Sequence, residues 1–229
     1  MKNISIAIDG PAGAGKSTIA RIVSKALGIL YLDTGAMYRA VALKAIRKNI
    51  CTKDGKALSI LVKDINIEIK HLADEQRVFL DGEDVSGMIR SPGVSIAASD
   101  VSSVPEIRIK MVELQREIAS KNSVVMDGRD IGTFVLPDAD FKFFLTASAE
   151  ERARRRYLEQ VEKGMAGFTL EDVRRDMEYR DLNDSSREFA PLKKAPDALE
   201  IDTTDMSVSQ VAEKILNVIR MGDKCFTMR

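Results

Sequence analysis

The most informative stretch of this chain is Gly10-Pro11-Ala12-Gly13-Ala14-Gly15-Lys16-Ser17. It fits the pattern G-x-x-x-x-G-K-[ST], which is typical of a loop that binds phosphates. An apolar run over residues 3–8 precedes it, and apolar residues recur at helical spacing from Ser17 onward. The expected context is therefore a strand, a glycine-rich loop and a helix, which is the arrangement that this pattern requires.

Each part of the pattern suits a phosphate. Glycines let the backbone bend so that successive N–H groups converge on phosphate oxygens at the start of a helix, where the helix dipole favours anions. Lys16 can reach the β and γ phosphates, Ser17 offers a hydroxyl to Mg²⁺, and Thr18 offers a second hydroxyl nearby. The sequence therefore predicts a nucleoside triphosphate site made by Gly10, Pro11, Ala12, Gly13, Ala14, Gly15, Lys16, Ser17 and Thr18.

The rest of the chain alternates between strand and helix patterns. Short apolar runs predict strands over residues 29–32, 123–126, 141–145 and 199–201. Helical spacing predicts helices over residues 36–46, 106–119, 169–182 and 207–220, and another that begins at Ser148. This alternation predicts an α/β fold, with a parallel sheet of about five strands and helices on both faces.

Two segments depart from this alternation. Between about residues 54 and 89, isoleucines alternate with polar residues before Asp81-Gly82, which predicts a small antiparallel insertion. The helix that begins at Ser148 carries four arginines, and its pattern alone leaves three interpretations open: a lid over phosphates, a solvated helix face, or a local RNA-binding patch. These four residues are Arg152, Arg154, Arg155 and Arg156.

Composition excludes several classes of protein. The 229 residues include 35 Lys+Arg and 35 Asp+Glu, so the chain lacks the broad positive field of a general DNA-coating protein. Cys51 and Cys225 are too few for a four-cysteine zinc site or a secreted disulfide scaffold. No signal peptide core or apolar stretch of about 20 residues is present. We therefore expect a cytoplasmic protein with no membrane or nucleic-acid partner.

A phosphate-binding loop alone fits a kinase, a guanine-nucleotide switch or a motor ATPase. The guanine-binding pattern N-K-x-D and the transporter pattern L-S-G-G-Q do not occur in the sequence. Arg39, after Asp33-Thr34-Gly35, and Arg129, within residues 127–130, offer a second group of anion-binding side chains at strand ends. Two anion sites favour phosphoryl transfer between two ligands. A kinase for another small metabolite and a slowly hydrolysing switch remain the alternatives.

Five segments give a more specific signal. In order, they are residues 8–17 (IDGPAGAGKS), 32–39 (LDTGAMYR), 80–86 (LDGEDVS), 126–133 (MDGRDIGT) and 190–192 (APL). With these segments the chain resembles the bacterial cytidylate kinases, which phosphorylate CMP and dCMP with ATP and Mg²⁺. The resemblance covers almost the whole chain, and the segments at 80–86 and 126–133 are its most specific parts.

The resemblance implies an adenylate-kinase-like three-layer fold that works as a monomer. It implies one kinase domain over residues 1–229, with a core formed by residues 1–53, 103–148 and 190–229. A nucleotide-monophosphate-binding insertion would occupy about residues 54–102, and a helical lid about residues 149–189. The implied substrates are CMP and dCMP in pyrimidine nucleotide metabolism, with ATP as donor and Mg²⁺ as cofactor.

The resemblance also implies roles for individual residues. The acceptor phosphate would contact Arg39, Arg129 and Arg187. The cytosine edge would contact Ser99, Arg108 and Asp130, with Thr34 and Tyr38 nearby. Arg180 and Asp184 would reach the sugar or the phosphates, and the lid arginines Arg152, Arg155 and Arg156 would reach ATP.

Phosphoryl transfer needs positioning and positive charge rather than a strong base. We expect Lys16, Arg129 and Arg155 to stabilise the transferring group, and Asp127 to hold a water molecule bound to Mg²⁺. Asp33 is a weaker candidate for that water. Asp9 is either a structural hydrogen-bond acceptor or a catalytic carboxylate, and it is not assigned to the site. His71, the only histidine, is interpreted as a surface residue without a catalytic role.

Overall fold

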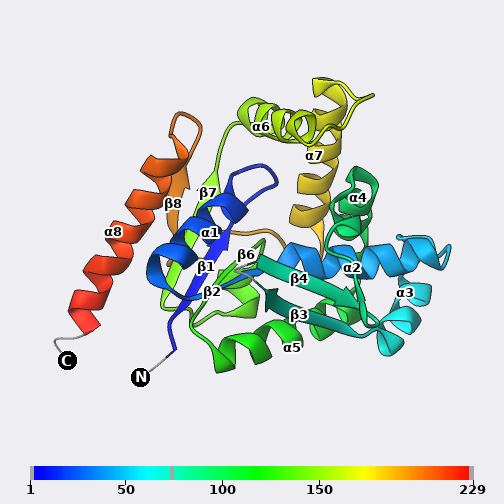
Figure 1. The fold of residues 1–229 in the computed structure, drawn as a ribbon, viewed down its shortest axis with the longest axis horizontal. Coiled ribbons are helices and arrows are strands. Elements are labelled where there is room, and N and C mark those ends of the chain that lie inside the picture. Colours follow the sequence, from blue (N-terminus) through cyan, green and yellow to red (C-terminus); the bar gives the residue numbers. More distant parts are fainter. Residues whose placement is uncertain (1–2, 73–74, 227–229) are drawn as a thin grey trace.

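The computed structural model describes residues 3–72 and 75–226. Within these residues the core is a five-stranded sheet in the order β2-β6-β1-β7-β8, and every pair of neighbouring strands is parallel (Figure 1). The strands are β1 (Ser5–Asp9), β2 (Leu30–Asp33), β6 (Val124–Gly128), β7 (Phe141–Thr146) and β8 (Leu199–Asp202). The predicted α/β fold with a parallel sheet is confirmed.

Helices cover both faces of this sheet. On one face, α1 (Lys16–Leu27) and α8 (Val208–Phe226) pack on alternate strand residues such as Ile6, Ile8 and Phe143. On the other face, Val112 of α5 (Pro105–Lys121) packs on the residues in between, including Ala7 and Met126. Successive residues of a strand point to opposite faces, so a sheet buried on both faces needs apolar residues at every position. The unbroken apolar runs in the sequence have this physical cause.

Gly10 sets the close packing between β1 and β7. Its φ is +146°, and a Cβ atom there would lie 2.0 Å from the carbonyl oxygen of Leu145. No side chain fits at that distance, so only glycine lets the chain leave β1 and turn into the loop that precedes α1. The loop then enters α1 at Lys16, with Gly15 in the left-handed conformation before it.

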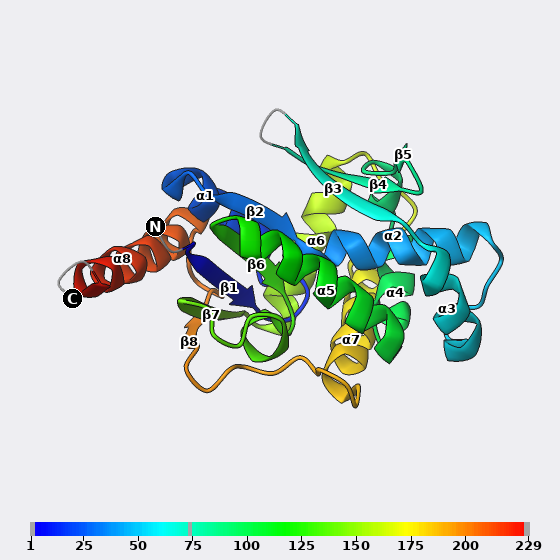
Figure 2. The same cartoon turned by 90° about the horizontal axis from the view of Figure 1, so that it is seen from below.

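The segment between β2 and α5 forms a second layer beside the sheet (Figure 2). It begins with α2 (Thr34–Arg47) and includes an antiparallel sheet in the order β3-β4-β5. The other elements in order are α3 (Gly55–Leu61), η1 (Val62–Asp64), β3 (Ile67–Leu72), β4 (Glu75–Leu80), β5 (Glu83–Asp84), η2 (Met88–Arg90) and α4 (Pro92–Val101). One apolar cluster joins α2, α5 and all of these elements except β5, whose two residues are exposed.

The predicted antiparallel insertion is confirmed, but two of its helices were not expected. Helix α3 has seven residues and begins at the cap Asp54. Helix α4 begins at the cap Ser91, with Pro92 in its first turn. Its small residues, Ala97, Ala98 and Ser99, give weak apolar periodicity, so the pattern does not mark it as a helix although tertiary packing buries it.

Two further helices stand above the carboxyl edge of the core sheet (Figure 1). They are α6 (Ala149–Glu162), capped by Ser148, and α7 (Leu170–Ser186), which Thr169 and Asp172 close with a capping box. A small apolar cluster joins Ala153 of α6 and Val173 and Met177 of α7 to Ala12 of the phosphate-binding loop. The short π-helix η3 (Ile131–Val135) follows β6 and was not predicted.

Two remaining expectations concern membranes and thiols. In the part of the chain that the structure describes, no helix combines the length and the apolar character that a membrane span needs. Cys51 is an exposed free thiol. The side chain of Cys225 lies outside the described part, as do residues 227–229.

Gly10→Ala is expected to destabilise the fold, because the added methyl group would overlap the Leu145 carbonyl group. We expect a loss of about 3 kcal/mol or more in the free energy of unfolding, measured by urea denaturation. Gly87→Ala is the matched control, since Gly87 has a φ of −74° and open space where a Cβ atom would lie. Equal effects of the two substitutions would contradict the packing role of Gly10.

Candidate nucleotide site

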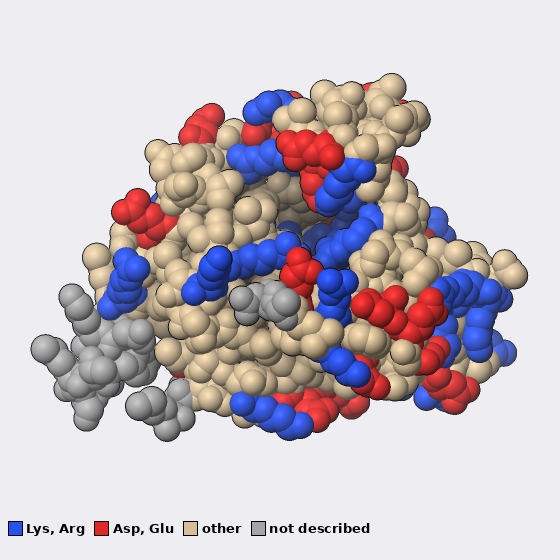
Figure 3. All heavy atoms as spheres, viewed as in Figure 1, with Lys and Arg blue, Asp and Glu red and all other residues tan. Residues whose placement is uncertain are grey.

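The strand register brings the predicted site residues to one edge of the core sheet. Asp9 of β1 pairs with Gly128 of β6, and Asp33 of β2 pairs with Asp127 of β6, so three strands end side by side. A cavity of about 1260 Å³ lies over this edge and beneath α6 and α7. Figure 3 shows Lys and Arg side chains around the hollow. Such a cavity, lined by positive charge at strand ends, suits phosphorylated ligands.

Lys16 lies in the wall of this cavity. It is buried, and its Nζ donates a hydrogen bond to the carbonyl oxygen of Pro11 at 2.6 Å. Burial lowers the pKa of Lys16 well below its usual value, and the positive charge of Arg129 lowers it further. A phosphate beside Nζ would offset both effects, because an opposite charge favours the ammonium form.

Two hydroxyl groups hold the Asp127 carboxylate. Ser17 Oγ donates to Oδ2 at 2.7 Å, and the Tyr31 hydroxyl donates to Oδ1 at 2.8 Å. Burial raises the pKa of Asp127. Hydroxyl and carboxylate oxygens are the ligands that Mg²⁺ prefers, usually together with substrate phosphates. The donor set therefore fits Mg²⁺, although Tyr31 was not among the predicted site residues.

Arg108 and Asp130 form a buried ion pair in the cavity wall. Arg108 Nη2 donates to Asp130 Oδ2, and Arg187 Nη2 lies 3.6 Å from Asp130 Oδ1. The Arg108 guanidinium lies over the Tyr38 ring at 5.4 Å, and burial raises the pKa of Tyr38 to about 12. Tyr38 Oη, Arg108 Nε and Arg187 Nη2 are buried without a hydrogen-bond partner among the described residues. Unpaired buried polar atoms are costly, so this wall is suited to a polar ligand.

The Asp184 carboxylate of α7 joins three separate segments. Its Oδ2 accepts a hydrogen bond from Arg129 Nε at 2.8 Å, and its Oδ1 accepts one from Ser99 Oγ of α4 at 3.2 Å. Burial alone would raise the pKa of Asp184, but the charges of Arg129 and Arg187 outweigh it and lower the pKa below its usual value. Asp184 thus connects the insertion, the end of β6 and the helices above the sheet.

Positive charge is concentrated beside Asp33. Asp33 Oδ2 lies 3.0 Å from Arg90 Nη1 and 3.7 Å from Arg39 Nη1. Arg39 also lies near Arg180: burial, followed by the charges of Arg129 and Arg39, lowers the pKa of Arg180 to about 9. Like charges held together in this way favour the binding of an anion. Arg90 was missed in the sequence, because no motif surrounds it.

The arginines of α6 have three different environments. Arg155 Nη1 donates to Thr203 Oγ1 at 2.9 Å, and Arg156 Nη1 donates to Glu159 at 2.8 Å; both arginines line the cavity. Arg152 Nη1 instead donates to Asp181 and to the carbonyl oxygen of Ala12. Arg154 is largely exposed and pairs with Glu151. The solvated-face interpretation therefore describes Arg154 but not its three neighbours.

Asp181 extends the contacts of Arg152. Its Oδ1 accepts a hydrogen bond from the backbone N–H of Ala12 at 3.0 Å. Helices α6 and α7 are thus tied to the phosphate-binding loop through Arg152 and Asp181. In this structure the Arg152 side chain bonds α7 and the phosphate-binding loop to α6. The resemblance implied a contact between Arg152 and ATP.

The cavity lining also includes apolar residues that no motif marked. They are Ile22 of α1, Leu158 of α6, and Met206, Val208 and Val211 near the start of α8. In the sequence these residues fit ordinary core positions of amphipathic helices, and only the folded chain leaves them facing a cavity.

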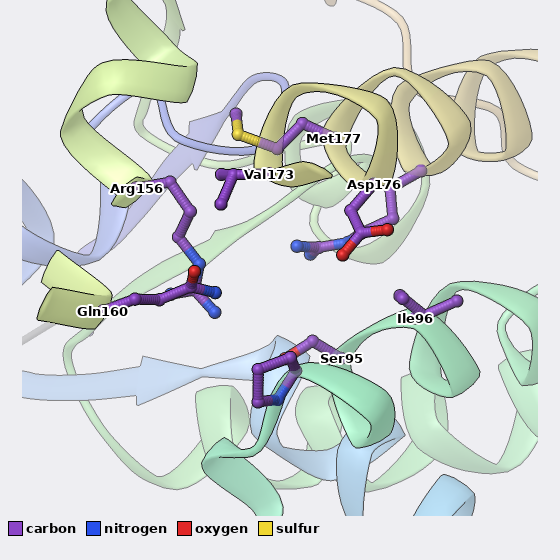
Figure 4. Close-up of a pocket in the computed structure, with 9 residues that line it drawn as sticks. Ser95, Ile96, Arg156, Gln160, Val173, Asp176 and Met177 are labelled. Carbon is purple, nitrogen blue, oxygen red and sulfur yellow. The ribbon is translucent and has the colours of Figure 1, made fainter. Parts of the chain in front are cut away.

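A second, much smaller pocket lies between α4, α6 and α7 (Figure 4). Ser95, Arg156, Gln160, Asp176 and Met177 are among its lining residues. Its volume of about 20 Å³ has room for about one water molecule. It is therefore a packing gap beside the main cavity rather than a second ligand site.

The structure brings most of the predicted site residues together. The predicted residues that line the main cavity are Ala12, Gly13, Ala14, Gly15, Lys16, Ser17, Thr18, Thr34, Tyr38, Arg39, Ser99, Arg108, Asp127, Arg129, Asp130, Arg155, Arg156, Arg180, Asp184 and Arg187. Gly10, Pro11 and Arg152 lie outside this lining. His71 is also away from it, and its Nε2 lies 2.8 Å from the carbonyl oxygen of Tyr31.

Sequence comparisons give a consistent relationship over nearly the whole chain. The family model described as "Cytidylate kinase" matches residues 6–221. A cytidylate kinase from Caldicellulosiruptor saccharolyticus is 51% identical over 220 residues, which cover 95% of this chain and 96% of that protein. A cytidylate kinase from Lactobacillus gasseri is 51% identical over 221 residues, which cover 96% of each chain.

Structural comparison supports the fold alone. The crystal structure of an uncharacterized protein from Eubacterium ventriosum aligns with a TM-score of 0.51 at 17% identity. The alignment covers 96% of this chain and 99% of that one.

Arg152→Gln is expected to lower the free energy of unfolding by about 1–3 kcal/mol, because it removes one partner of a part-buried ion pair and a hydrogen bond to the phosphate-binding loop. Arg154→Gln is the control on the same helix. It should change stability by less than about 0.5 kcal/mol, since its ion pair is exposed. Urea denaturation of both variants measures the difference, and equal stabilities would refute the role of Arg152 as a tie.

Proposed function

The chain belongs to the cytidylate kinase family, and from this membership we infer that it transfers the γ-phosphoryl group of ATP to CMP or dCMP, giving ADP and CDP or dCDP. The observation that carries this inference is the identity of about half of all residues over nearly the full length of both chains. The cavity supports it, since it has room for two nucleotides at the edge where phosphate-binding groups gather.

We propose that ATP occupies the side of the cavity formed by residues 12–18 of the phosphate-binding loop and α1. The backbone N–H groups of the loop and the start of α1 would bind its phosphates, with Lys16 beside the β and γ phosphates. The adenine ring would lie against apolar lining residues such as Leu158 and Val208. A flat, largely apolar base suits such a surface.

The acceptor phosphate is proposed to bind Arg39, Arg129 and Arg187. All three guanidinium groups line the cavity, and Arg39 Nη1 is buried without a hydrogen-bond partner among the described residues. Guanidinium groups bind phosphate oxygens through paired hydrogen bonds. Arg180, whose pKa is lowered mainly by burial and then by neighbouring positive charge, would gain a favourable partner when the dianion arrives.

Cytosine is proposed to be read by Asp130, Arg108 and Ser99. Cytosine presents an exocyclic amino donor beside ring acceptors, which match a carboxylate and an arginine. Uracil presents a carbonyl oxygen where cytosine has the amino group, so the Asp130 carboxylate would face another acceptor. A buried polar group left unpaired in this way disfavours the wrong ligand.

Mg²⁺ is proposed to bind beside Ser17 and Asp127, where the oxygen donors suit it. When bound, it supplies positive charge that offsets the charge of the β and γ phosphates. The Ser17 hydroxyl donates to Asp127, which leaves its oxygen lone pairs available to a cation. Tyr31 fixes the other carboxylate oxygen of Asp127. The protein thus holds both candidate donors in place.

The reaction itself needs no strong general base. The acceptor phosphate is largely ionised near neutral pH, so its oxygen can attack without losing a proton to the protein. Lys16, Arg129 and Arg155 would stabilise the negative charge that spreads over the transferring group. Closure of α6 and α7 over the cavity would exclude water and limit ATP hydrolysis.

We propose that residues 1–229 act as one domain, with residues 54–102 as the acceptor-binding insertion and residues 149–189 as the lid. The apolar cluster that α2, the insertion and α5 share supports a single domain. We propose that the protein acts as a monomer, as the resemblance implies. A cytoplasmic place in pyrimidine nucleotide metabolism follows from the proposed substrates and the reducing environment that two cysteines suggest.

A coupled assay of ADP formation tests the proposed reaction directly. With ATP and Mg²⁺, we expect turnover with CMP and dCMP well above that with UMP, AMP, GMP and dTMP, and above a control that lacks an acceptor. Turnover that does not depend on an acceptor would support a hydrolysing switch and contradict the proposal. Turnover with a different acceptor alone would retain the kinase but reject the cytosine assignment.

Asp130→Asn is expected to reduce kcat/KM for CMP by about tenfold to a hundredfold, because an amide replaces one acceptor oxygen with a donor and weakens the contact with the amino group. Activity with UMP should fall less or rise. Asp138→Asn is the control, because Asp138 is an exposed aspartate that also follows β6. Its kcat/KM for CMP should match that of the parent protein. Equal losses with CMP and UMP would refute the role of Asp130 in reading the base.

A further inference from the structure

Asp9 is a buried carboxylate that the proposed reaction does not use. It ends β1, directly before the phosphate-binding loop, and is 4% exposed. Its Oδ1 accepts a hydrogen bond from the backbone N–H of Ile131 at 2.8 Å, and its Oδ2 accepts one from the N–H of Gly132 at 2.7 Å. These contacts connect the end of β1 to a segment more than a hundred residues away in the sequence.

The two N–H groups belong to the start of η3, immediately after Asp130. The first N–H groups of a helix have no partner within it and need one from elsewhere. A Cβ atom at Gly132 would lie 3.4 Å from Asp9 Oδ2 and 3.2 Å from the Lys142 side chain. Gly132 thus lets the carboxylate approach closely, which gives the second glycine of the segment 126–133 a physical reason.

Only a carboxylate can accept both hydrogen bonds in this place. An asparagine has one acceptor oxygen, and its amide nitrogen would face an N–H donor. Burial raises the pKa of Asp9 to about 7, whereas the two N–H groups oppose that rise. A buried carboxylate is a costly way to satisfy a helix start. This cost indicates that the backbone position of Ile131 and Gly132, which Asp9 fixes, has a further role.

The two residues immediately before Ile131 contact other parts of the site. Asp130 extends to Arg108, and Arg129 extends to Asp184 on α7. Fixing the backbone of Ile131 and Gly132 therefore limits where the Asp130 carboxylate and the Arg129 guanidinium can lie. Because Asp9 directly precedes Gly10, the same carboxylate relates this segment to the loop that binds the donor phosphates.

We propose that Asp9 is a positioning residue for acceptor selectivity. By holding the Ile131 and Gly132 amides, it places the Asp130 carboxylate against the cytosine edge, in a fixed position relative to the phosphate-binding loop. This inference rests on the proposed function. It differs from a purely structural role for Asp9, because that role predicts a loss of stability without a change in substrate preference.

Asp9→Asn tests the proposal at nearly constant side-chain size. We expect the ratio of kcat/KM for CMP to that for UMP to fall by about tenfold, the change that corresponds to roughly one hydrogen bond. The loss should lie mainly in a raised KM for CMP, and calorimetric titration with CMP should show the same weakening. The coupled assay and the thermal unfolding midpoint are measured for each variant.

Asp140→Asn is the matched control. Asp140 Oδ2 accepts hydrogen bonds from the Ser5 N–H at 2.9 Å and the Ser5 hydroxyl at 3.1 Å, at the opposite end of β1 and away from the cavity lining. This substitution perturbs the same strand, so it should lower the thermal midpoint without changing the CMP to UMP ratio.

A second variant alters the contact between Asp9 and Gly132 at the Gly132 side. Gly132→Ala places a methyl group against Asp9 and Lys142, so it should also lower the CMP to UMP ratio, even if Asp9→Asn does not fold. A parent-like ratio and a parent-like KM for CMP in either folded variant would overturn the proposal and leave Asp9 a structural role. A parent protein without CMP turnover would instead overturn the proposed function.

Discussion

Charged side chains gather at the carboxyl edge of the core sheet, where the parallel register places Asp9, Asp33 and Asp127 at the ends of neighbouring strands. Each of the three is at most 5% exposed. A buried carboxylate is unstable unless hydrogen bonds or opposite charges compensate it. Backbone amides hold Asp9, hydroxyl groups hold Asp127, and arginines accompany Asp33. The need to compensate these charges determines how the surrounding segments pack.

The same need ties the outer parts of the molecule to the sheet. The insertion reaches the core through Arg90 and Asp33, and helix α7 of the proposed lid reaches it through Asp184 and Arg129. Asp181 connects α7 to the phosphate-binding loop. The insertion also shares an extended apolar cluster with α2 and α5, whereas the apolar contact of α6 and α7 with the phosphate-binding loop is small. Ligand phosphates would compete for the same arginines, so substrate binding and the placement of the insertion and the lid are expected to be coupled.

Much of the fold could be predicted from the sequence because its signals are local. Unbroken apolar runs marked the buried strands, and the glycine loop before Lys16 marked the first turn from strand to helix. Helix α4 could not be predicted, because its small residues carry little periodicity and only packing against α2 and α7 makes it a buried helix. The π-helix η3 was missed for a related reason, since its first amides depend on Asp9, which is distant in the sequence.

The sequence by itself determined that this chain binds a nucleoside triphosphate, that its core is an α/β sheet, and that it resembles cytidylate kinases, because motifs and periodicity are properties of contiguous residues. Only the tertiary structure decided which charged groups face one another. In the folded chain Arg90 pairs with Asp33 and Arg152 pairs with Asp181. Asp9 accepts a hydrogen bond from the Ile131 N–H, next to Asp130. The partners of a buried charge come from distant parts of the chain, so folding alone selects them.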